Sequence, residues 1–180
     1  MTAFYSPARR PLDEVERQRA VDASGFLHAG GDPTLARLIR EAAELLDTEM
    51  AAIAIVDHDR QYFPVELGLG ISETPRTVSF SAHAILRPDR PFCVLDAGRD
   101  TRFAGNPLVL APPEIRFYAG VPLIGDDEQP IGALCVLDRE PGDVPSNAQF
   151  DALMALAARA IMRAPPCAAE DQDAGFSACA

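Results

Sequence analysis

The chain of 180 residues contains no tryptophan, and aromatic residues of all kinds make up only 7% of it. Basic residues are also few, since 16 of them stand against 27 aspartates and glutamates and leave a net charge of −11. Nucleic acid and anionic membrane surfaces repel so acidic a chain on average, and we expect neither as a partner. No apolar run approaches the roughly 18 residues of a membrane-spanning helix and no signal peptide opens the chain, so we expect a soluble, cytoplasmic protein.

Cysteine is scarce as well, and none of the four cysteines forms a CxxC pair. Cys93 and Cys135 lie within apolar runs, where a free thiol behaves as a small hydrophobic group, and Cys167 and Cys179 lie near the C-terminus. This spacing argues against a disulfide framework and against a zinc site. Ser81 is followed two residues later by a histidine, which points elsewhere on a helix and cannot serve as its base. We therefore expect no metal, no catalytic residue and no enzyme.

The composition is that of a globular protein with one core, because 48% of the residues are hydrophobic and 24% are charged. Residues 1–11 show no periodicity, and we expect a flexible arm there. We expect residues 12–163 to form one domain. Residues 164–180 are small, acidic and without pattern, which predicts a disordered tail.

Two segments in the first third of the chain have the pattern of helices. Acidic residues crowd the first turn of residues 12–23, where the helix dipole favours them, and we expect Leu12 and Val15 on its buried face. Residues 33–48 follow Asp32, which can cap a helix, and their apolar residues recur at helical spacing.

Two more helices are expected further along the chain. A short one spans residues 78–86 and ends before Pro88. The last spans residues 147–163 and begins with a capping box, because Ser146 is followed three residues later by Gln149.

Short runs rich in apolar and β-branched residues predict five strands, over residues 51–56, 61–66, 92–95, 115–124 and 131–137. The second should lie at an edge of the sheet, because Pro64 cannot donate a ladder hydrogen bond. Residues 67–76 are expected to be a loop, and residues 96–114 an ordered loop with a helical turn. Hairpins dominate this order, which predicts an α+β fold with an antiparallel β-sheet of about five to six strands. Helices would pack on one face, and a layer of loop and short helix would cover a pocket on the other.

Four stretches carry a family resemblance: SFSAHAI (Ser79–Ile85), DTRFAGNPLV (Asp100–Val109), IRFYAGVPL (Ile115–Leu123) and IGALCVLDREP (Ile131–Pro141). In this order they resemble a GAF domain over about residues 12–163, which implies a GAF-like fold and a signalling role. Members of that family bind cyclic nucleotides, tetrapyrroles, haem or small metabolites, so the cofactor stays unknown. Many close relatives have a cysteine where this chain has Ser81, and its absence argues against covalent bilin attachment.

Within these stretches we expect seven side chains to bind a ligand: Ser81, His83, Arg102, Phe103, Asn106, Arg116 and Tyr118. Arg116 and Tyr118 are two residues apart on a strand and should face the same side. A guanidinium and a phenol on one face can hold a carboxylate or a phosphate. The structural alternative is that Arg116 pairs with Asp96 or Asp100 and braces the fold.

The other polar candidates also have a structural alternative. His83 can donate to a ligand or bind haem, or it can be a satisfied, half-buried side chain. Asp100 and Asn106 are common turn builders and can serve the loop alone. Arg102 also has two possible roles: it can stack on its neighbour Phe103, or it can point at a ligand.

The sequence thus predicts a non-catalytic sensory module whose pocket lies between the sheet and residues 79–118. We expect a homodimer through the terminal helices and output to a signalling partner of the kinase or cyclase class. One alternative is a dimeric interaction scaffold with a vestigial pocket, which a filled pocket centre and an internally paired Arg116 would favour. Another is an enzyme of the free methionine-sulfoxide reductase type that would use Cys93 and Cys135.

Overall fold

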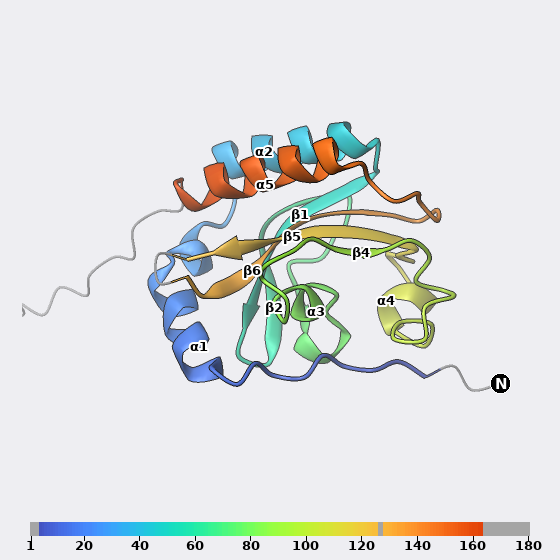
Figure 1. Ribbon diagram of the computed structural model, residues 1–180, viewed down its shortest axis with the longest axis horizontal. Coiled ribbons are helices and arrows are strands. Elements are labelled where there is room, and N and C mark those ends of the chain that lie inside the picture. The colour runs from blue at the N-terminus through green and yellow to red at the C-terminus, as the bar shows by residue number, and fades with distance from the viewer. Residues whose placement is uncertain (1–3, 126–127, 164–180) are drawn as a thin grey trace, which may run out of the picture.

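The computed structural model describes residues 4–125 and 128–163 (Figure 1). Six antiparallel strands form one sheet in the order β3-β2-β1-β6-β5-β4. The strands are β1 (Met50–Asp57), β2 (Arg60–Leu67), β3 (Glu73–Pro75), β4 (Phe92–Val94), β5 (Phe117–Ile124) and β6 (Pro130–Asp138). The helices are α1 (Glu14–Ala23), η1 (Phe26–His28), α2 (Pro33–Leu46), η2 (Arg76–Val78), α3 (Ser81–Ala84), α4 (Pro107–Leu110) and α5 (Asn147–Ile161).

The predicted α+β fold is confirmed, and all five predicted strands are present. β1 and β6 form the centre of the sheet and are buried over nearly their whole length. The sixth strand, β3, lies within residues 67–76, which were expected to be a loop. It has three residues, too few for an alternating pattern to be recognised. The predicted tail over residues 164–180 lies outside the described part of the chain.

The prediction that β2 is an edge strand is wrong, because β2 lies between β1 and β3. Its pairing with β1 shifts locally: Ile53 is opposite Val65, whereas Ile55 is opposite Tyr62. β2 therefore has one residue more than β1 in this stretch, which is a β-bulge. Pro64 lies in the bulge and beyond the last residue that β3 pairs with, so its missing N–H group is tolerated.

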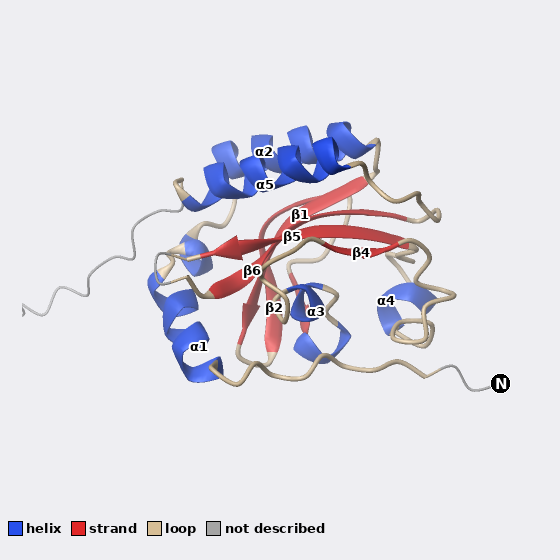
Figure 2. Cartoon of the chain, viewed as in Figure 1, coloured by secondary structure: helices blue, strands red, loops and turns tan. Residues whose placement is uncertain are grey.

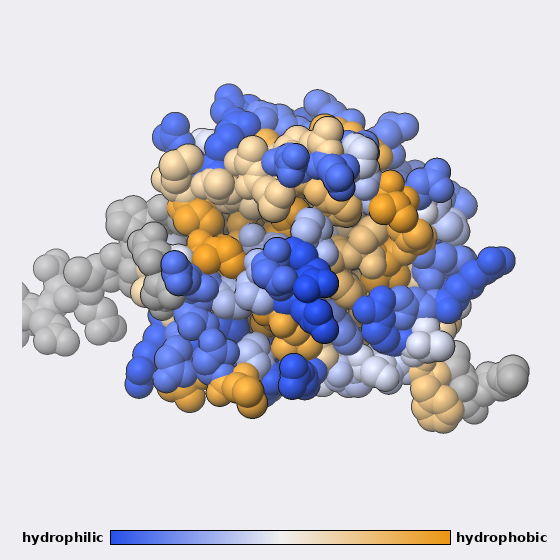
Figure 3. All heavy atoms as spheres, viewed as in Figure 1, coloured by the Kyte–Doolittle hydropathy of each residue, from blue (hydrophilic) through white to orange (hydrophobic). Residues whose placement is uncertain are grey.

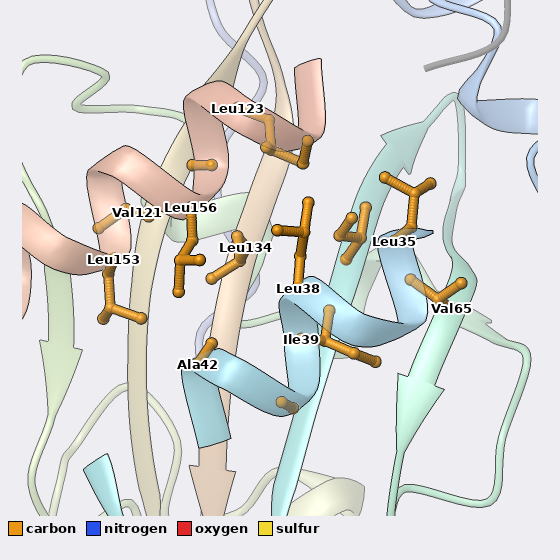
Figure 4. Packing of buried hydrophobic residues seen from close by; sticks show 14 of the residues in the cluster. Leu35, Leu38, Ile39, Ala42, Val65, Val121, Leu123, Leu134, Leu153 and Leu156 are labelled. Atoms are coloured by element: carbon orange, nitrogen blue, oxygen red, sulfur yellow. The ribbon is translucent and has the colours of Figure 1, made fainter. Parts of the chain in front are cut away.

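Helices α2 and α5 lie side by side on one face of the sheet (Figure 2). Both begin as predicted. The Asp32 carboxylate accepts from the N–H groups of the first turn of α2, at 2.8 and 2.9 Å, and Ser146 and Gln149 form a capping box on α5. Leu38 of α2, Leu153 of α5 and Leu134 of β6 are at most 1% exposed and meet in the core below these helices (Figure 4).

The opposite face of the sheet is covered by short elements, namely η2, α3, α4 and the loop over residues 96–106. The single helix predicted over residues 78–86 is in fact η2 and α3, separated by Ser79 with an extended backbone (φ −74°, ψ 125°). No helix in the described part of the chain has the length and apolar character needed to cross a membrane.

Helix α1 packs with a different face from the one predicted. Leu12 and Val15 are 100% and 61% exposed, whereas Arg17 is fully buried and Gln18 nearly so. The expectation rested on apolar residues facing the core. It is wrong because the buried side of α1 combines Ala20 and Val21 with the polar Arg17 and Gln18, whose burial an apolar pattern cannot reveal.

A buried ion cluster attaches α1 to the rest of the domain. Arg17 donates to the backbone oxygen of Val56 at 2.7 Å, and the Glu14 carboxylate accepts from both Arg17 and Arg76. Burial alone would raise the pKa of Glu14, but the two arginines outweigh it and lower this pKa to about 2. Glu14 is therefore ionised at neutral pH and connects two buried cations.

Candidate functional site

Aromatic rings fill the space between the sheet and α3. Phe80 and Phe103 stack in parallel, with 4.1 Å between their centroids. The Tyr118 ring of β5 lies 5.4 Å from that of Phe80 and 5.8 Å from that of Phe92. His83 completes the cluster, 4.9 Å from Phe103 in an edge-on arrangement. We call these five side chains the aromatic cluster.

A small polar group lies inside the aromatic cluster. The Tyr118 hydroxyl is 3.0 Å from the Ser81 hydroxyl, and both residues are 1% exposed. Cys135 of β6 lies against them, and its thiol is 3.6 Å from the backbone oxygen of Ala52. Burial raises the pKa of Tyr118 well above its usual range and that of Cys135 to about 12, so both groups are neutral.

Gly120 allows the Tyr118 ring to adopt this position. The two residues are neighbours on the same face of β5. A side chain at position 120 would overlap the Tyr118 hydroxyl and ring edge. Without that side chain the phenol lies along the strand and reaches Ser81, and it thereby fills the centre of the expected pocket.

The cavity that remains beside Tyr118 measures about 10 Å³. It is lined mainly by apolar side chains, with Gln61, Ser81 and Cys135 among them. That volume is about the size that one water molecule needs. The structure therefore shows the expected pocket region in a closed and filled form.

Arg116 does not join Tyr118 at the aromatic cluster. It precedes β5 and pairs with Asp96, with N–O distances of 2.8 and 2.9 Å. Its guanidinium lies over Gly98, where a side chain would come within 3.0 to 3.1 Å of it. Burial alone would raise the pKa of Asp96, but hydrogen bonds from Arg116 and from the Gly98 N–H lower it. Arg116 is thus paired with an acidic loop residue, which is the structural alternative considered in the sequence analysis.

Arg102 and His83 lie at the outer rim of the aromatic cluster. Arg102 is paired with Asp100 and lies 5.1 and 5.3 Å above the centroids of the Phe92 and Phe103 rings. Its contacts are therefore both ionic and cation–π. Burial, and secondarily the charge of Arg102, lower the pKa of His83, which favours a neutral imidazole.

Asn106 is buried and serves the loop architecture. Its side-chain oxygen accepts from the N–H of Leu108 and caps α4, and its amide donates to the backbone oxygen of Val78 at 3.0 Å. It thereby joins the loop to η2.

Of the seven predicted ligand-binding residues, His83, Phe103 and Tyr118 belong to the aromatic cluster, Ser81 contacts the Tyr118 hydroxyl inside it, and Arg102 lies at its rim.

The two cysteines in the described part of the chain lie on opposite faces of the sheet. Cys93 is paired in register with Ala119 and packs on the α2 and α5 side. Cys135 is paired with Gly120 and packs on the α3 side. Burial raises the pKa of Cys93 to about 11. The sheet separates the two thiols, so they cannot act as a pair without a rearrangement of the strands.

One trio has donor atoms at metal-ligand spacing. Oxygens of Asp22 and Asp57 and a nitrogen of His58 lie within 4.8 Å of one another. The Asp57 carboxylate already accepts from Gln18 and from Arg60, each at 2.8 Å. These bonds explain the cluster without an ion, and we assign it no metal.

Three residues of the site were not among the predicted ligand contacts, namely Phe80, Phe92 and Cys135. Phe80 stands inside the SFSAHAI stretch, so its neighbours had already marked the segment. Phe92 and Cys135 were placed on strands, but the sequence did not indicate which face they occupy. The pairing of Phe92 with Gly120 and of Gly120 with Cys135 brings them together.

The geometry and the comparisons with known proteins identify the same family. The six-stranded antiparallel sheet, with long helices on one face and short helices over a filled pocket region on the other, defines an α+β domain. Residues 31–163 match the family model of the GAF domain, and the chain belongs to this family. It is 46% identical over 131 residues to a cyclic di-GMP phosphodiesterase of Pseudomonas aeruginosa. That match covers 73% of this chain but only 22% of the relative.

Solved structures with a similar fold come from proteins of several kinds. The blue-light absorbing form of the PixJ GAF domain of Thermosynechococcus elongatus has a TM-score of 0.58 at 17% identity, over 84% of this chain and 87% of that one. A type II free methionine-R-sulfoxide reductase of Thermoplasma acidophilum has a TM-score of 0.56 at 12% identity, over 74% and 89% of the two chains. At these identities the likeness shows the fold alone.

Proposed function

We propose that this domain is a non-catalytic regulatory module that responds to a small molecule bound under α3. Membership of the GAF family supports the signalling role. The observation that carries the proposal is the buried contact between the Tyr118 and Ser81 hydroxyls within the aromatic cluster. These are polar groups at the centre of an apolar site, and such groups fix the orientation of a ligand.

The test is a thermal-shift screen with cyclic nucleotides, haem, bilins and amino acids. A ligand at about 100 times its Kd adds about 2.7 kcal/mol of stability and raises Tm by several degrees. The shift should shrink in Tyr118→Phe and persist in Arg37→Gln, a change at an exposed position of α2 on the other face of the sheet. If no compound raises Tm, or if the rise in Tm is the same in the wild type and in Tyr118→Phe, the support for sensing at this site is removed.

We further propose that the output is the activity of an enzyme of cyclic di-GMP turnover. The support is the relative described above, in which a similar segment belongs to a cyclic di-GMP phosphodiesterase. The sequence had suggested a kinase or a cyclase as the partner class. Measuring phosphodiesterase activity of such an enzyme with and without the purified domain tests this step. The same phosphodiesterase activity without the domain and at a saturating concentration of the domain would contradict this proposal.

The dimer expected from the sequence is proposed through α5. Its outer side carries Met154, which is 44% exposed, beside small exposed alanines, and Met162, which is 75% exposed, follows directly after the helix. In Figure 3 the surface over α5 is mostly pale to orange, with blue atoms along its borders. Light scattering should show a dimer that Met154→Glu converts to a monomer. Leu110→Glu, which changes an equally apolar exposed residue on α4, should leave the mass unchanged.

An interaction scaffold is the second candidate, and two specific observations favour it. The cavity beside Tyr118 holds about one water, and Arg116 is paired with Asp96. A scaffold would regulate its partner through the dimer alone. Partner activity that responds to Met154→Glu but not to Tyr118→Phe would support the scaffold over the sensor.

A further inference from the structure

The segment of residues 4–10, which we call the N-terminal strap, crosses the outer side of α3 on its way to α1 (Figure 1). At one end its backbone bonds the loop that follows β4. The Ser6 N–H donates to the backbone oxygen of Arg102 at 2.9 Å, and the Phe4 oxygen accepts from the Gly105 N–H at 3.1 Å. The expectation of a flexible arm did not include these contacts.

The middle of the strap lies on α3 itself. The Ser6 backbone oxygen is 3.1 Å from Nε2 of His83, and Ala8 packs on the small apolar group of Val56, Ala82 and Ile85. At its far end Arg10 contacts the Glu14 carboxylate at 3.2 Å and thereby reaches the buried ion cluster of α1. The strap is thus attached on both sides of α3.

Helix α3 is held between the strap and the closed pocket. Its inner side presents Ser81, which bonds Tyr118, and the Phe80 ring just before it stacks on Phe103 and Tyr118. α3 has only four helical residues, and so short a helix depends on packing rather than on its own hydrogen bonds. Any ligand that replaces Tyr118 beneath α3 has to displace this helix or its neighbours outward, toward the strap.

The strap itself is weakly held. Phe4 is 77% exposed, and the backbone bonds at Ser6 and Phe4, the contact with His83, the packing of Ala8 and the solvent-screened ion pairs of Arg10 must offset the entropy of ordering the whole segment. Segments with so few buried apolar contacts open at low free energy. A modest change at the N-terminal end of the domain is therefore enough to shift the balance between the attached and the released strap.

We propose that the N-terminal strap is a regulatory clamp that keeps α3 closed over the pocket, so that strap release and pocket opening are coupled. The proposal rests on the proposed function, because it concerns access to the same site. Coupling of this kind is reciprocal: whatever pulls the strap away eases ligand entry, and a ligand that lifts α3 weakens the strap. Signals could then pass between the N-terminal side of the domain and its pocket.

Cys135 offers a direct readout, because it lines the closed cavity and its thiol is shielded by Ser81 and Tyr118. In the full chain with the other three cysteines changed to serine, the rate of maleimide labelling under native conditions reports how often the pocket opens. Ala8→Gln places an amide against Val56, Ala82 and Ile85 and should raise this rate about fivefold. Arg9→Gln is the matched control, since Arg9 is exposed, and it should leave the rate unchanged.

A second variant acts on the strap alone. Ser6→Pro removes the N–H that donates to Arg102 and touches no residue of the core, so it should raise the labelling rate with little change in Tm. Amide exchange measured in parallel should increase in α3 and the 102–106 loop but not in α2 or α5. Unchanged labelling in both variants would overturn the proposal. So would a rise in exchange throughout the domain, because it would make the strap a general brace.

The labelling experiment and the ligand screen can fail independently, so they test the clamp and the sensing function separately. Faster labelling in the strap variants together with an empty screen would support the clamp and remove the sensing function. A ligand that shifts Tm equally in the wild type and in Ser6→Pro would support sensing and overturn the clamp, because coupling requires tighter binding when the strap is released.

Discussion

On the α2 and α5 face of the sheet the buried side chains are mainly aliphatic, and they come mostly from two long, capped helices and four strands, with smaller contributions from α1 and η1. On the α3 face, stacked rings surround a hydroxyl pair and a thiol, and the covering elements have three or four residues each. The first face makes one continuous packed layer. The second is assembled from short pieces that hydrogen bonds and ion pairs connect to one another.

This difference separates stability from responsiveness. Aliphatic packing on long helices gains free energy in proportion to the apolar area buried, about 25 cal/mol per Å², and opens only with the whole domain. Short elements joined by a few polar contacts can move individually. The regulatory function that we propose requires both, and here the sheet divides them between its two sides.

The largest effect is expected from Leu38→Ala on the α2 face. Leu38 is 1% exposed among the side chains of Figure 4, and its truncation should cost about 3 kcal/mol of unfolding free energy because a cavity remains. Urea denaturation measures it. Leu12→Ala is the matched control, and its fully exposed side chain should make that change nearly neutral. Similar costs for the two would mean that the α2 face is not the stable base.

Glu14→Gln should come next, with a loss of about 2 kcal/mol at pH 7, since hydrogen bonds from two buried arginines lose their charged acceptor. The pKa of Glu14 is about 2 in the folded state and near 4.5 when unfolded. The wild type should therefore keep this stabilisation above pH 4.5 and lose it as the pH falls toward 2.

The control for Glu14→Gln is Glu16→Gln, an exposed carboxylate on the same helix. Denaturation curves across pH 2 to 7 should show a flatter profile for Glu14→Gln than for wild type, and no such flattening for Glu16→Gln. Parallel profiles for all three proteins would show that polar contacts do not anchor α1.

Gly120→Ala tests how tightly the α3 face is filled. The added methyl group overlaps the Tyr118 ring, and overpacking of this kind costs about 2 kcal/mol. The same substitution in a Tyr118→Ala background should cost much less, because the overlapping atoms are gone. Equal costs in the two backgrounds would show that Tyr118 is free to leave its position above Gly120.

The smallest effect is expected from Arg116→Gln, about 0.5 kcal/mol, because its partly exposed ion pair with Asp96 is screened by solvent. The substitution should let the pKa of Asp96 rise toward its ordinary value, which carboxyl NMR titration measures. The pair then stabilises the wild type above the ordinary Asp pKa and loses its effect as the pH falls. Arg99→Gln, an exposed neighbour of Asp96, should raise that pKa less.

The sequence was sufficient to predict the helices on the α2 and α5 face, because their apolar residues and caps follow local patterns. The stripe of α2, the Asp32 cap and the capping box at Ser146 all follow local rules, and each is present as predicted. The buried side of α1 could not be predicted in the same way. Arg17 is buried because it finds the backbone oxygen of Val56, a partner 39 residues away that no local pattern announces.

The sequence predicted which segments form the site, but not how their side chains are arranged in it. The motif stretches correctly mark the segments that meet at Tyr118, and the resemblance correctly identifies the family. Whether Arg116 turns to the pocket or to Asp96 depends on the loop path around Gly98. Whether the pocket is open depends on how the Tyr118 ring lies over Gly120, which is a matter of tertiary packing.

The two borders of the sheet have a consequence for how molecules of this protein meet in solution. β3 and β4 are three residues long, so they leave part of β2 and part of β5 uncovered. Each uncovered stretch contains a proline, Pro64 in one and Pro122 in the other. A proline removes a donor that a foreign strand would need, which discourages edge-to-edge aggregation. Pro64 and Pro122 therefore make the two uncovered stretches of the sheet poor templates for a further strand.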